Sequence, residues 1–262
     1  MISSIQNPTV KFVRRLQAEK RFRRREAAFV VEGTRWLQEL INQAHPLQFV
    51  FYTDDWQKNN NHLDILQQVT VSAQVVSDEV MAAMSDTETP PGVLCVGQVA
   101  PLPLPDQPSF LLILDSVTTP GNLGTMLRSA AAAGVDGVLL TPGCVDAYNP
   151  KVLRGSMGAH LRLPVHEVEW AEIEEIVGQM AVWLTAVSNA TDYTTINWTQ
   201  PSAVIIGNEA RGVGDEAERL ANGRLTIPMH RDTESLNAAT AAAVVLFEAA
   251  RQRRKQLTAN SM

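Results

Sequence analysis

The sequence predicts an α/β protein in which a small N-terminal α/β domain precedes a larger domain built on a doubly wound parallel sheet. Four prolines within residues 101–108 exclude a helix or a central strand there. Apolar segments of strand length alternate with helical patterns on both sides of this stretch. We therefore expect a domain at 1–100, a linker at 101–108 and a second domain at 109–262.

In the N-terminal part the patterns predict helices and strands of ordinary length. The expected elements are a helix near 33–44, a strand near 47–53, a helix at 62–69 and a strand near 92–99. In the C-terminal part we expect strands at 110–115, 137–143, 182–188 and 202–209, a helix that ends at Gly134, and a last helix behind Ser235 as its N-cap.

Composition excludes several classes of protein. The chain has 262 residues, of which 45% are hydrophobic, so a well-buried core is expected. No apolar run approaches the roughly 20 residues that cross a bilayer, and the N-terminus lacks a signal-peptide core, which predicts a cytoplasmic protein without a membrane partner. Cys95 and Cys144 lie far apart, so neither a disulfide framework nor a zinc ribbon is expected.

Common catalytic and cofactor motifs are missing from the sequence. There is no P-loop and no histidine spacing that assembles a metal, so we expect no metal. The segment RGSMG, residues 154–158, differs from a nucleophile elbow by one position. The segment GNLG, residues 121–124, lacks the third glycine of a dinucleotide fingerprint, which leaves a nicotinamide enzyme as a weak alternative.

Charge is distributed very unevenly along this acidic chain. The net charge is -6, yet residues 11–25 hold eight of the 22 Lys and Arg residues against one glutamate. This segment is either a solvated helix face or a contact for a polyanion such as RNA. The candidate RNA-binding residues are Arg21, Arg23, Arg24 and Arg25.

Three polar clusters follow predicted strands, where open α/β sheets place their ligands. Residues 115–130 hold Asn122 and Arg128, residues 205–214 hold three glycines and Glu209, and residues 225–237 hold Ser235 and Asn237. Taken singly, these clusters also suit a helix cap, a surface arginine and a tight turn.

Together and in this order, the clusters resemble the three motifs of the SpoU family of RNA ribose methyltransferases: NxGxxxR, then GNExxG, then IPM followed by SLN. Residues 151–165 resemble the segment between the first two motifs. The N-terminal part resembles the small RNA-binding domain, similar to certain ribosomal proteins, that many members carry. One departure is Thr119, where members commonly have aspartate.

The resemblance implies a Rossmann-like SPOUT domain with a C-terminal trefoil knot, and a homodimer whose subunits complete each other's sites. It implies S-adenosylmethionine as cofactor, bound by Gly207, Ile227 and Leu236. The catalytic residues that it implies are Asn122, Arg128, Glu209, Ser235 and Asn237. Because arginine resists deprotonation, we expect Arg128 to act as a cation rather than as a base.

The expected function is methyl transfer from S-adenosylmethionine to a ribose 2'-hydroxyl of RNA, without a metal. Ribosomal RNA is favoured as the partner because the two-domain layout resembles the ribosomal enzymes. A transfer RNA 2'-O-methyltransferase and a catalytically silent RNA-binding or ribosome-assembly protein are the alternatives.

Overall fold

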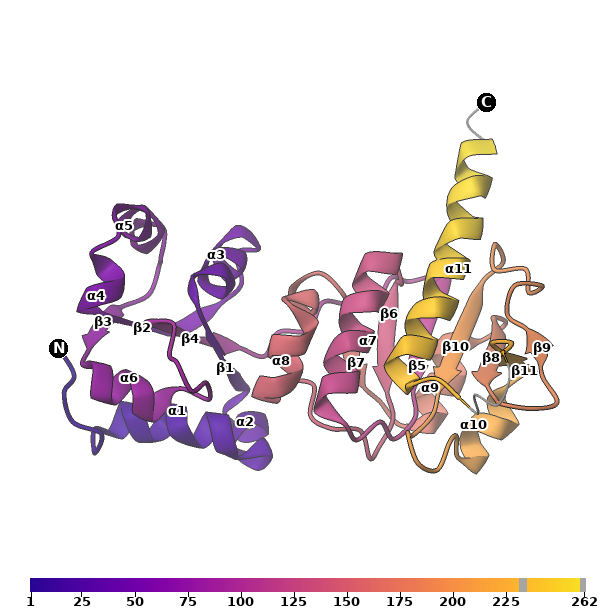
Figure 1. The fold of residues 1–262 in the computed structure, drawn as a ribbon, viewed down its shortest axis with the longest axis horizontal. Coiled ribbons are helices and arrows are strands. Elements are labelled where there is room, and N and C mark those ends of the chain that lie inside the picture. The colour runs from indigo at the N-terminus through magenta and orange to yellow at the C-terminus, as the bar shows by residue number, and fades with distance from the viewer. Residues whose placement is uncertain (231–234, 260–262) are drawn as a thin grey trace. The chain divides into compact units, whose positions relative to one another are not determined.

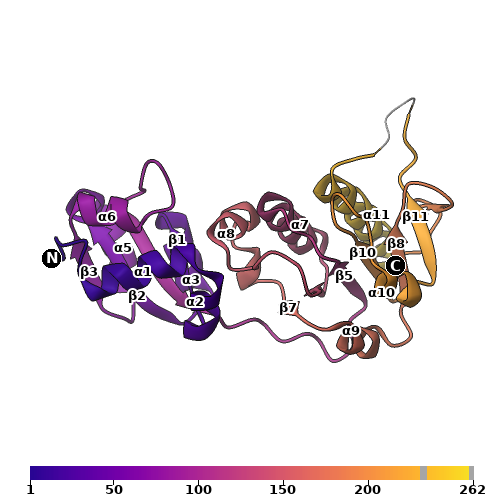
Figure 2. The ribbon, with the colours of Figure 1, turned by 90° about the horizontal axis from the view of Figure 1, so that it is seen from below.

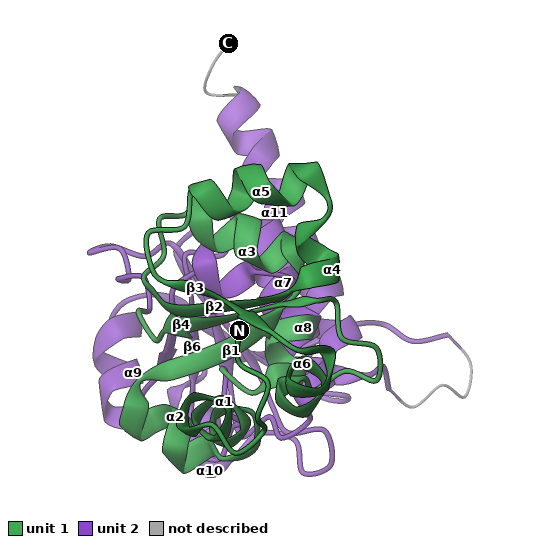
Figure 3. Cartoon of the chain, turned by 90° about the vertical axis from the view of Figure 1, so that its left-hand side faces the viewer, with its two compact units in different colours: residues 1–100, 148–154 green, residues 101–147, 155–262 purple. Residues whose placement is uncertain are grey.

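The computed structural model describes residues 1–230 and 235–259 and divides into two compact units (Figure 3). Unit 1 contains residues 1–100 and 148–154, and unit 2 contains residues 101–147 and the chain from 155 onward. The expected division assigned residues 148–154 to the C-terminal domain, whereas they pack with unit 1. No described helix combines the length and the apolar character that crossing a membrane requires.

Unit 1 is a four-stranded sheet flanked by helices. Its strands are β1 (Ala28–Glu32), β2 (Leu47–Thr53), β3 (Ala73–Val76) and β4 (Val93–Gln98), in the order β1-β4-β2-β3. Only the β2–β3 pair is parallel. The helices are α1 (Pro8–Ala18), α2 (Lys20–Glu26), α3 (Thr34–Asn42), α4 (Asp54–Gln57), α5 (Asn60–Gln67) and α6 (Asp78–Met84), and most of α8 (Pro150–Ser156) also belongs here.

The apolar side of α1 anchors the basic segment to the core of unit 1. Val10, Val13 and Leu16 recur at helical spacing and are fully buried in a cluster that also contains Phe22 of α2. Asn7 caps α1, and Pro8 occupies its first turn, where a missing N–H costs nothing. The basic residues between these apolar positions therefore sit on short helices fixed by their buried faces.

Unit 2 is built on a seven-stranded, fully parallel sheet in the order β7-β6-β5-β10-β8-β11-β9 (Figure 1). The strands are β5 (Phe110–Leu114), β6 (Gly137–Leu140), β7 (Val165–Glu167), β8 (Ala181–Thr185), β9 (Thr191–Asp192), β10 (Ser202–Ile206) and β11 (Gly223–Thr226). The helices are α7 (Pro120–Ala133), α9 (Trp170–Val177), α10 (Asp215–Leu220) and α11 (Ala238–Ala259), with a 3-10 turn, η1 (Ala159–Leu161).

Helices cover both faces of this sheet, which explains why its central strands are uninterrupted apolar runs. β5 and β10 are buried along their whole length. α9 and α10 pack on one face, whereas α7 and α11 lie beside each other on the other (Figure 2). β10 enters between the earlier strands β5 and β8, and β11 enters between β8 and β9. The parallel sheet that the sequence predicts is confirmed.

Residues 101–108 form neither helix nor strand, as their prolines predict. Leu104 packs on Gly137, and the Leu102 carbonyl accepts a hydrogen bond from His166 Nε2 (2.8 Å). One local expectation needs correction, because the N-cap of α11 is Asn237 rather than Ser235. Asn237 Oδ1 accepts from the backbone N–H groups of Ala239 (2.9 Å) and Thr240 (3.3 Å).

Candidate functional site

A cavity of about 1000 Å³ opens where β8, β10 and β11 end. Its walls come from the last residues of these strands, the loops that follow them and the starts of α7 and α11. The lining residues are Thr119, Asn122, Thr185, Ala186, Val187, Ile206, Gly207, Asn208, Glu209, Gly212, Leu225, Thr226, Ile227, Pro228, Met229, Ser235, Leu236, Asn237, Ala238 and Ala241. All the predicted cofactor-binding residues line it.

The loop after β10 requires glycine at position 207. The backbones of Asn208 and Gly212 exchange two hydrogen bonds of 2.8 and 2.9 Å, which folds the loop tightly back on itself. A Cβ at Gly207 would lie 2.4 Å from the carbonyl carbon of Gly212, a distance that side chains do not adopt. The glycine therefore permits the loop that forms one wall of the cavity.

Asp115, directly after β5, fastens the far end of the same loop. Its buried carboxylate accepts from Gly214 N (2.6 Å) and from the Thr141 hydroxyl (3.2 Å). Asn208 Nδ2 adds a bond to the Ser116 carbonyl (2.7 Å). Sequence reasoning missed these supports, although the polar residue that directly follows a buried apolar strand was an available signal.

Glu209 is the centre of a hydrogen-bond network at the rim of the cavity. Its carboxylate accepts from Asn122 Nδ2 (3.0 Å) and from the backbone N–H groups of Thr119 (3.3 Å) and Thr118 (3.4 Å). Partial burial raises the pKa of Glu209, but these hydrogen bonds outweigh it and leave the pKa below its ordinary value. The carboxylate is thus an engaged acceptor and a weak base.

The amide groups of Asn122 and Asn237 have a defined orientation. Because Asn237 Oδ1 caps α11, its Nδ2 is the donor to Asn122 Oδ1 (3.0 Å). Asn122 Nδ2 is then the donor to Glu209. A directed chain of hydrogen bonds therefore runs from the first turn of α11 through the two amides to the carboxylate.

The structure brings together four of the five residues that sequence analysis assigned to catalysis. Asn122, Glu209, Ser235 and Asn237 line the cavity, whereas Arg128 does not. Arg128 is exposed on α7, two turns beyond Asn122, and its side chain has no hydrogen-bond or ion-pair partner among the described residues. A single copy of the chain does not place Arg128 in the cavity.

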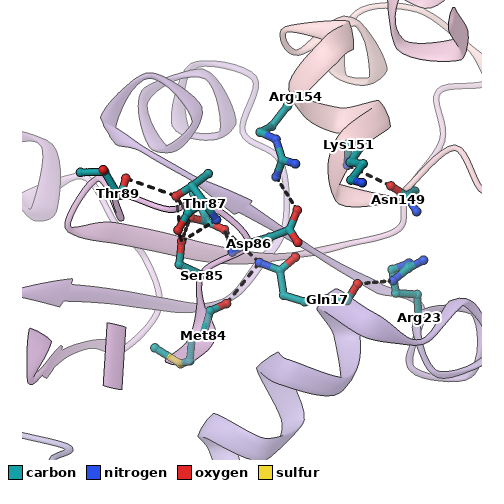
Figure 4. A network of polar contacts seen from close by, with 11 residues as sticks. Gln17, Arg23, Met84, Ser85, Asp86, Thr87, Thr89, Asn149, Lys151 and Arg154 are labelled. Atoms are coloured by element: carbon teal, nitrogen blue, oxygen red, sulfur yellow. Dashed lines mark hydrogen bonds and ion pairs between the residues drawn. The ribbon is translucent and has the colours of Figure 1, made fainter. Parts of the chain in front are cut away.

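In the basic segment, Arg23 is a structural residue, so our expectation that it contacts RNA is wrong. Arg23 is only 3% exposed. Its Nη1 donates to the carbonyls of Leu16 (2.6 Å) and Gln17 (3.1 Å), in the last turn of α1 (Figure 4). The guanidinium therefore donates hydrogen bonds to carbonyls that have no intrahelical donor at the end of a helix.

The other three predicted RNA-binding arginines are exposed. Arg25 pairs with Glu26 (2.6 Å) and lies over the ring of Phe22, 4.7 Å from its centroid. Arg15 stacks on the same ring at 4.0 Å and pairs with Glu19. Phe12 packs edge to face against Phe22 at the edge of the core of unit 1. The cations of this surface are thus partly preorganised by an aromatic ring and by carboxylates.

Helix α8 is fastened to unit 1 by an ion pair of 2.7 Å between Arg154 and Asp86 (Figure 4). Asp86 belongs to a loop that Glu32 holds by accepting from Asp86 N (2.8 Å) and from the hydroxyl of Thr87 (3.2 Å). The segment between the first two SpoU-like motifs, residues 151–165, is therefore divided: its first residues belong to unit 1 and the rest to unit 2.

The contact between Ser156 and His160 does not form a competing catalytic site. Ser156 Oγ lies 3.0 Å from His160 Nδ1, but both residues are buried, and desolvation lowers the pKa of His160 to about 4. The described residues contain no group of three or more His, Cys, Asp or Glu side chains that could hold a metal ion.

Comparison with protein families identifies the architecture. Residues 109–247 match the SpoU rRNA Methylase family. The chain belongs to this family. A second match, residues 7–95, is to the MRM3-like substrate binding domain, so this SpoU protein carries its catalytic-type domain behind a domain of the substrate-binding type.

Relatives cover nearly the whole SpoU chain. An uncharacterised tRNA/rRNA methyltransferase of Synechocystis sp. is 37% identical, over 96% of this chain and 93% of the relative. The 23S rRNA (guanosine(2553)-2'-O)-methyltransferase of Bacillus subtilis is 31% identical, over 94% and 97%. The AdoMet-bound rRNA methyltransferase from Sinorhizobium meliloti aligns with a TM-score of 0.86 at 26% identity, over 95% and 97%.

Proposed function

We propose that this protein is an S-adenosylmethionine-dependent RNA methyltransferase that modifies a ribose 2'-hydroxyl of ribosomal RNA. The observation that carries the proposal is the directed chain Asn237–Asn122–Glu209 at the rim of the cavity, in a member of the SpoU family. The named relative from Bacillus subtilis supports ribosomal RNA as the substrate. The cytoplasmic location predicted from the sequence is part of this proposal.

The cavity suits the proposed cofactor in size and chemistry. Its volume of about 1000 Å³ lies in the range of small-molecule sites. Gly207 places backbone without a side chain in the cavity wall, and Ile227 and Leu236 add apolar surface beside the polar rim. An S-adenosylmethionine molecule likewise combines flat, weakly polar surface on its adenine ring with hydroxyls and charged groups. Gly207, Ile227 and Leu236 would hold it.

The bound cofactor supplies an electrophilic methyl group. In the proposed reaction this methyl group would pass to the ribose 2'-oxygen, with S-adenosylhomocysteine as the leaving group and the hydroxyl proton released to solvent. Positioning and electrostatic stabilisation must then provide the rate. Glu209 is unsuited as the base because its pKa is lowered, and its role is to orient Asn122. Ser235 and the free N–H groups of Asn122 and Asn237 orient the ribose.

Arg128 has a place in this reaction only if a second copy of the chain brings it to the cavity. We therefore include a homodimer in the proposal, in which Arg128 of one copy stabilises the developing alkoxide in the site of the other. Its exposure and its lack of a partner within the described residues support this role. The insertion of β10 and β11 between earlier strands supports the trefoil knot expected for the domain.

Methyl transfer from labelled S-adenosylmethionine to unmodified in vitro transcribed large-subunit ribosomal RNA tests the function. We expect label in one ribose, located by mapping 2'-O-methyl positions, and a dimer by light scattering. Label in transfer RNA alone would identify transfer RNA, not ribosomal RNA, as the substrate. Binding of cofactor and RNA without methyl transfer to either RNA would identify a catalytically silent RNA-binding protein.

A further inference from the structure

Nearly all described cationic side chains of unit 2 already have an interaction inside the protein. The arginine–carboxylate pairs are Arg219–Glu216, Arg224–Glu218 and Arg251–Glu248. Arg162, Arg253 and Arg254 donate to carbonyls. The hydrogen bond from Arg251 lowers the pKa of Glu248, and the charge of Lys255 adds to this effect. Arg128 and Arg211 are the exceptions among the described residues. Arg128 is assigned to the reaction, which leaves Arg211 without a role.

Arg211 belongs to the loop that forms one wall of the cavity, and its backbone is held by hydrogen bonds. Its loop neighbours Glu209 and Gly212 both line the cavity. Asn208 Oδ1 accepts the backbone N–H of Arg211 (3.1 Å), and the paired backbones of Asn208 and Gly212 close the loop on either side. The backbone is thus held in place while the side chain is exposed to solvent.

The acidic groups nearest to Arg211 in the chain do not neutralise it. Glu209 accepts hydrogen bonds from Thr118, Thr119 and Asn122. Glu216 pairs with Arg219 (3.7 Å). Asp215, at the start of α10, makes no ion pair with Arg211 in the described part of the chain. An uncompensated cation beside a cavity is notable in a protein with a net charge of -6.

We propose that Arg211 binds a phosphate group of the RNA substrate, adjacent to the ribose that enters the cavity. This inference rests on the proposed function. A guanidinium presents two parallel N–H donors to the oxygens of a phosphodiester, which fixes orientation as well as adding attraction. Because the backbone of Arg211 is already fixed, binding orders only the side chain. The contact positions the RNA backbone against the site.

Arg211→Gln tests the contact, with Arg219→Gln as the matched control. Each change removes one exposed charge, but only Arg211 belongs to the loop that lines the cavity. With unmodified in vitro transcribed large-subunit ribosomal RNA, Arg211→Gln should raise KM for RNA about tenfold, the size of one lost charged hydrogen bond. The slope of log affinity against log salt should become shallower by about one.

Two further readouts separate a phosphate contact from a loss of structure. Arg211→Gln should leave the melting temperature and the S-adenosylmethionine affinity unchanged, and Arg211→Lys should recover the salt slope but only part of KM. A KM and a salt slope equal to those of Arg219→Gln would overturn the inference while wild-type methyl transfer upholds the function. If the wild-type protein binds RNA but transfers no methyl group, the proposed function is contradicted. The salt dependence of RNA binding by wild type and Arg211→Gln would still decide the role of Arg211.

Discussion

The basic helices of unit 1 and the cavity of unit 2 use polar side chains in opposite ways. On α1 and α2 the exposed cations are numerous and similar, and several rest on one aromatic ring or one carboxylate. At the rim of the cavity, Asn122, Glu209 and Asn237 each have distinct partners and a fixed direction. The first surface therefore suits additive, salt-dependent attraction, whereas the second suits alignment that fails when one member changes.

The largest effect should come from Arg128, the one residue assigned to the reaction that lies outside its own cavity. Arg128→Ala should lower kcat by about 10²–10³, the usual cost of one lost electrostatic donor in a transition state. S-adenosylmethionine affinity, measured by calorimetry, should hardly change. A wild-type kcat in this variant would remove Arg128 from the mechanism, and full activity of Arg128→Lys would show that a point charge suffices.

The amide chain should show strong coupling between its members. Asn122→Asp places a carboxylate against Glu209, and Glu209→Gln places one amide N–H group against another, so each should lower kcat by about ten- to a hundredfold. Joining the two changes restores a donor opposite an acceptor. The double variant should therefore be more active than either single variant. Losses that simply multiply would contradict a directed chain.

We expect Arg23 to contribute to folding stability rather than to RNA binding. Arg23→Gln removes a buried guanidinium from the carbonyls at the end of α1 and should lower the free energy of unfolding by about 1.5–3 kcal/mol. Urea unfolding measures it, with exposed Arg21→Gln as the control that stays near wild type. Equal stabilities of the two variants would return Arg23 to the list of candidate RNA contacts.

The smallest effect on turnover is expected from the exposed arginines of α2. Replacing Arg21, Arg24 and Arg25 with glutamine should weaken RNA binding and flatten its salt dependence by up to about three in logarithmic slope. Cofactor binding and kcat at saturating RNA should persist. Superimposable salt titrations of wild type and the triple variant would identify the segment as a solvated helix face.

Apolar runs along the chain predicted the parallel sheet, and the resemblance to the SpoU motifs named most of the residues that line the cavity. Both missed what depends on side-chain direction. The burial of Arg23 depends on the extended backbone of Glu19, which separates α1 from α2, and on the reach of the side chain to the last carbonyls of α1; a count of charges contains neither. The support from Asp115 depends on Gly214, which is 99 residues away. The cap of α11 depends on which of two polar residues, Ser235 or Asn237, starts the helix.

The bond between Asn122 and Asn237 joins residues 115 positions apart. Glu209 bridges another 91 positions back to Thr118. Contacts of such long sequence separation form late, because the entropy of closing the chain must be offset first. In a nascent or refolding chain we therefore expect the first strands of the sheet to form before the hydrogen bonds among Asn122, Asn237 and Glu209. Recovery of methyl transfer after dilution from denaturant should lag behind recovery of the circular dichroism signal, so the activity reports the docking of α11 rather than the appearance of secondary structure.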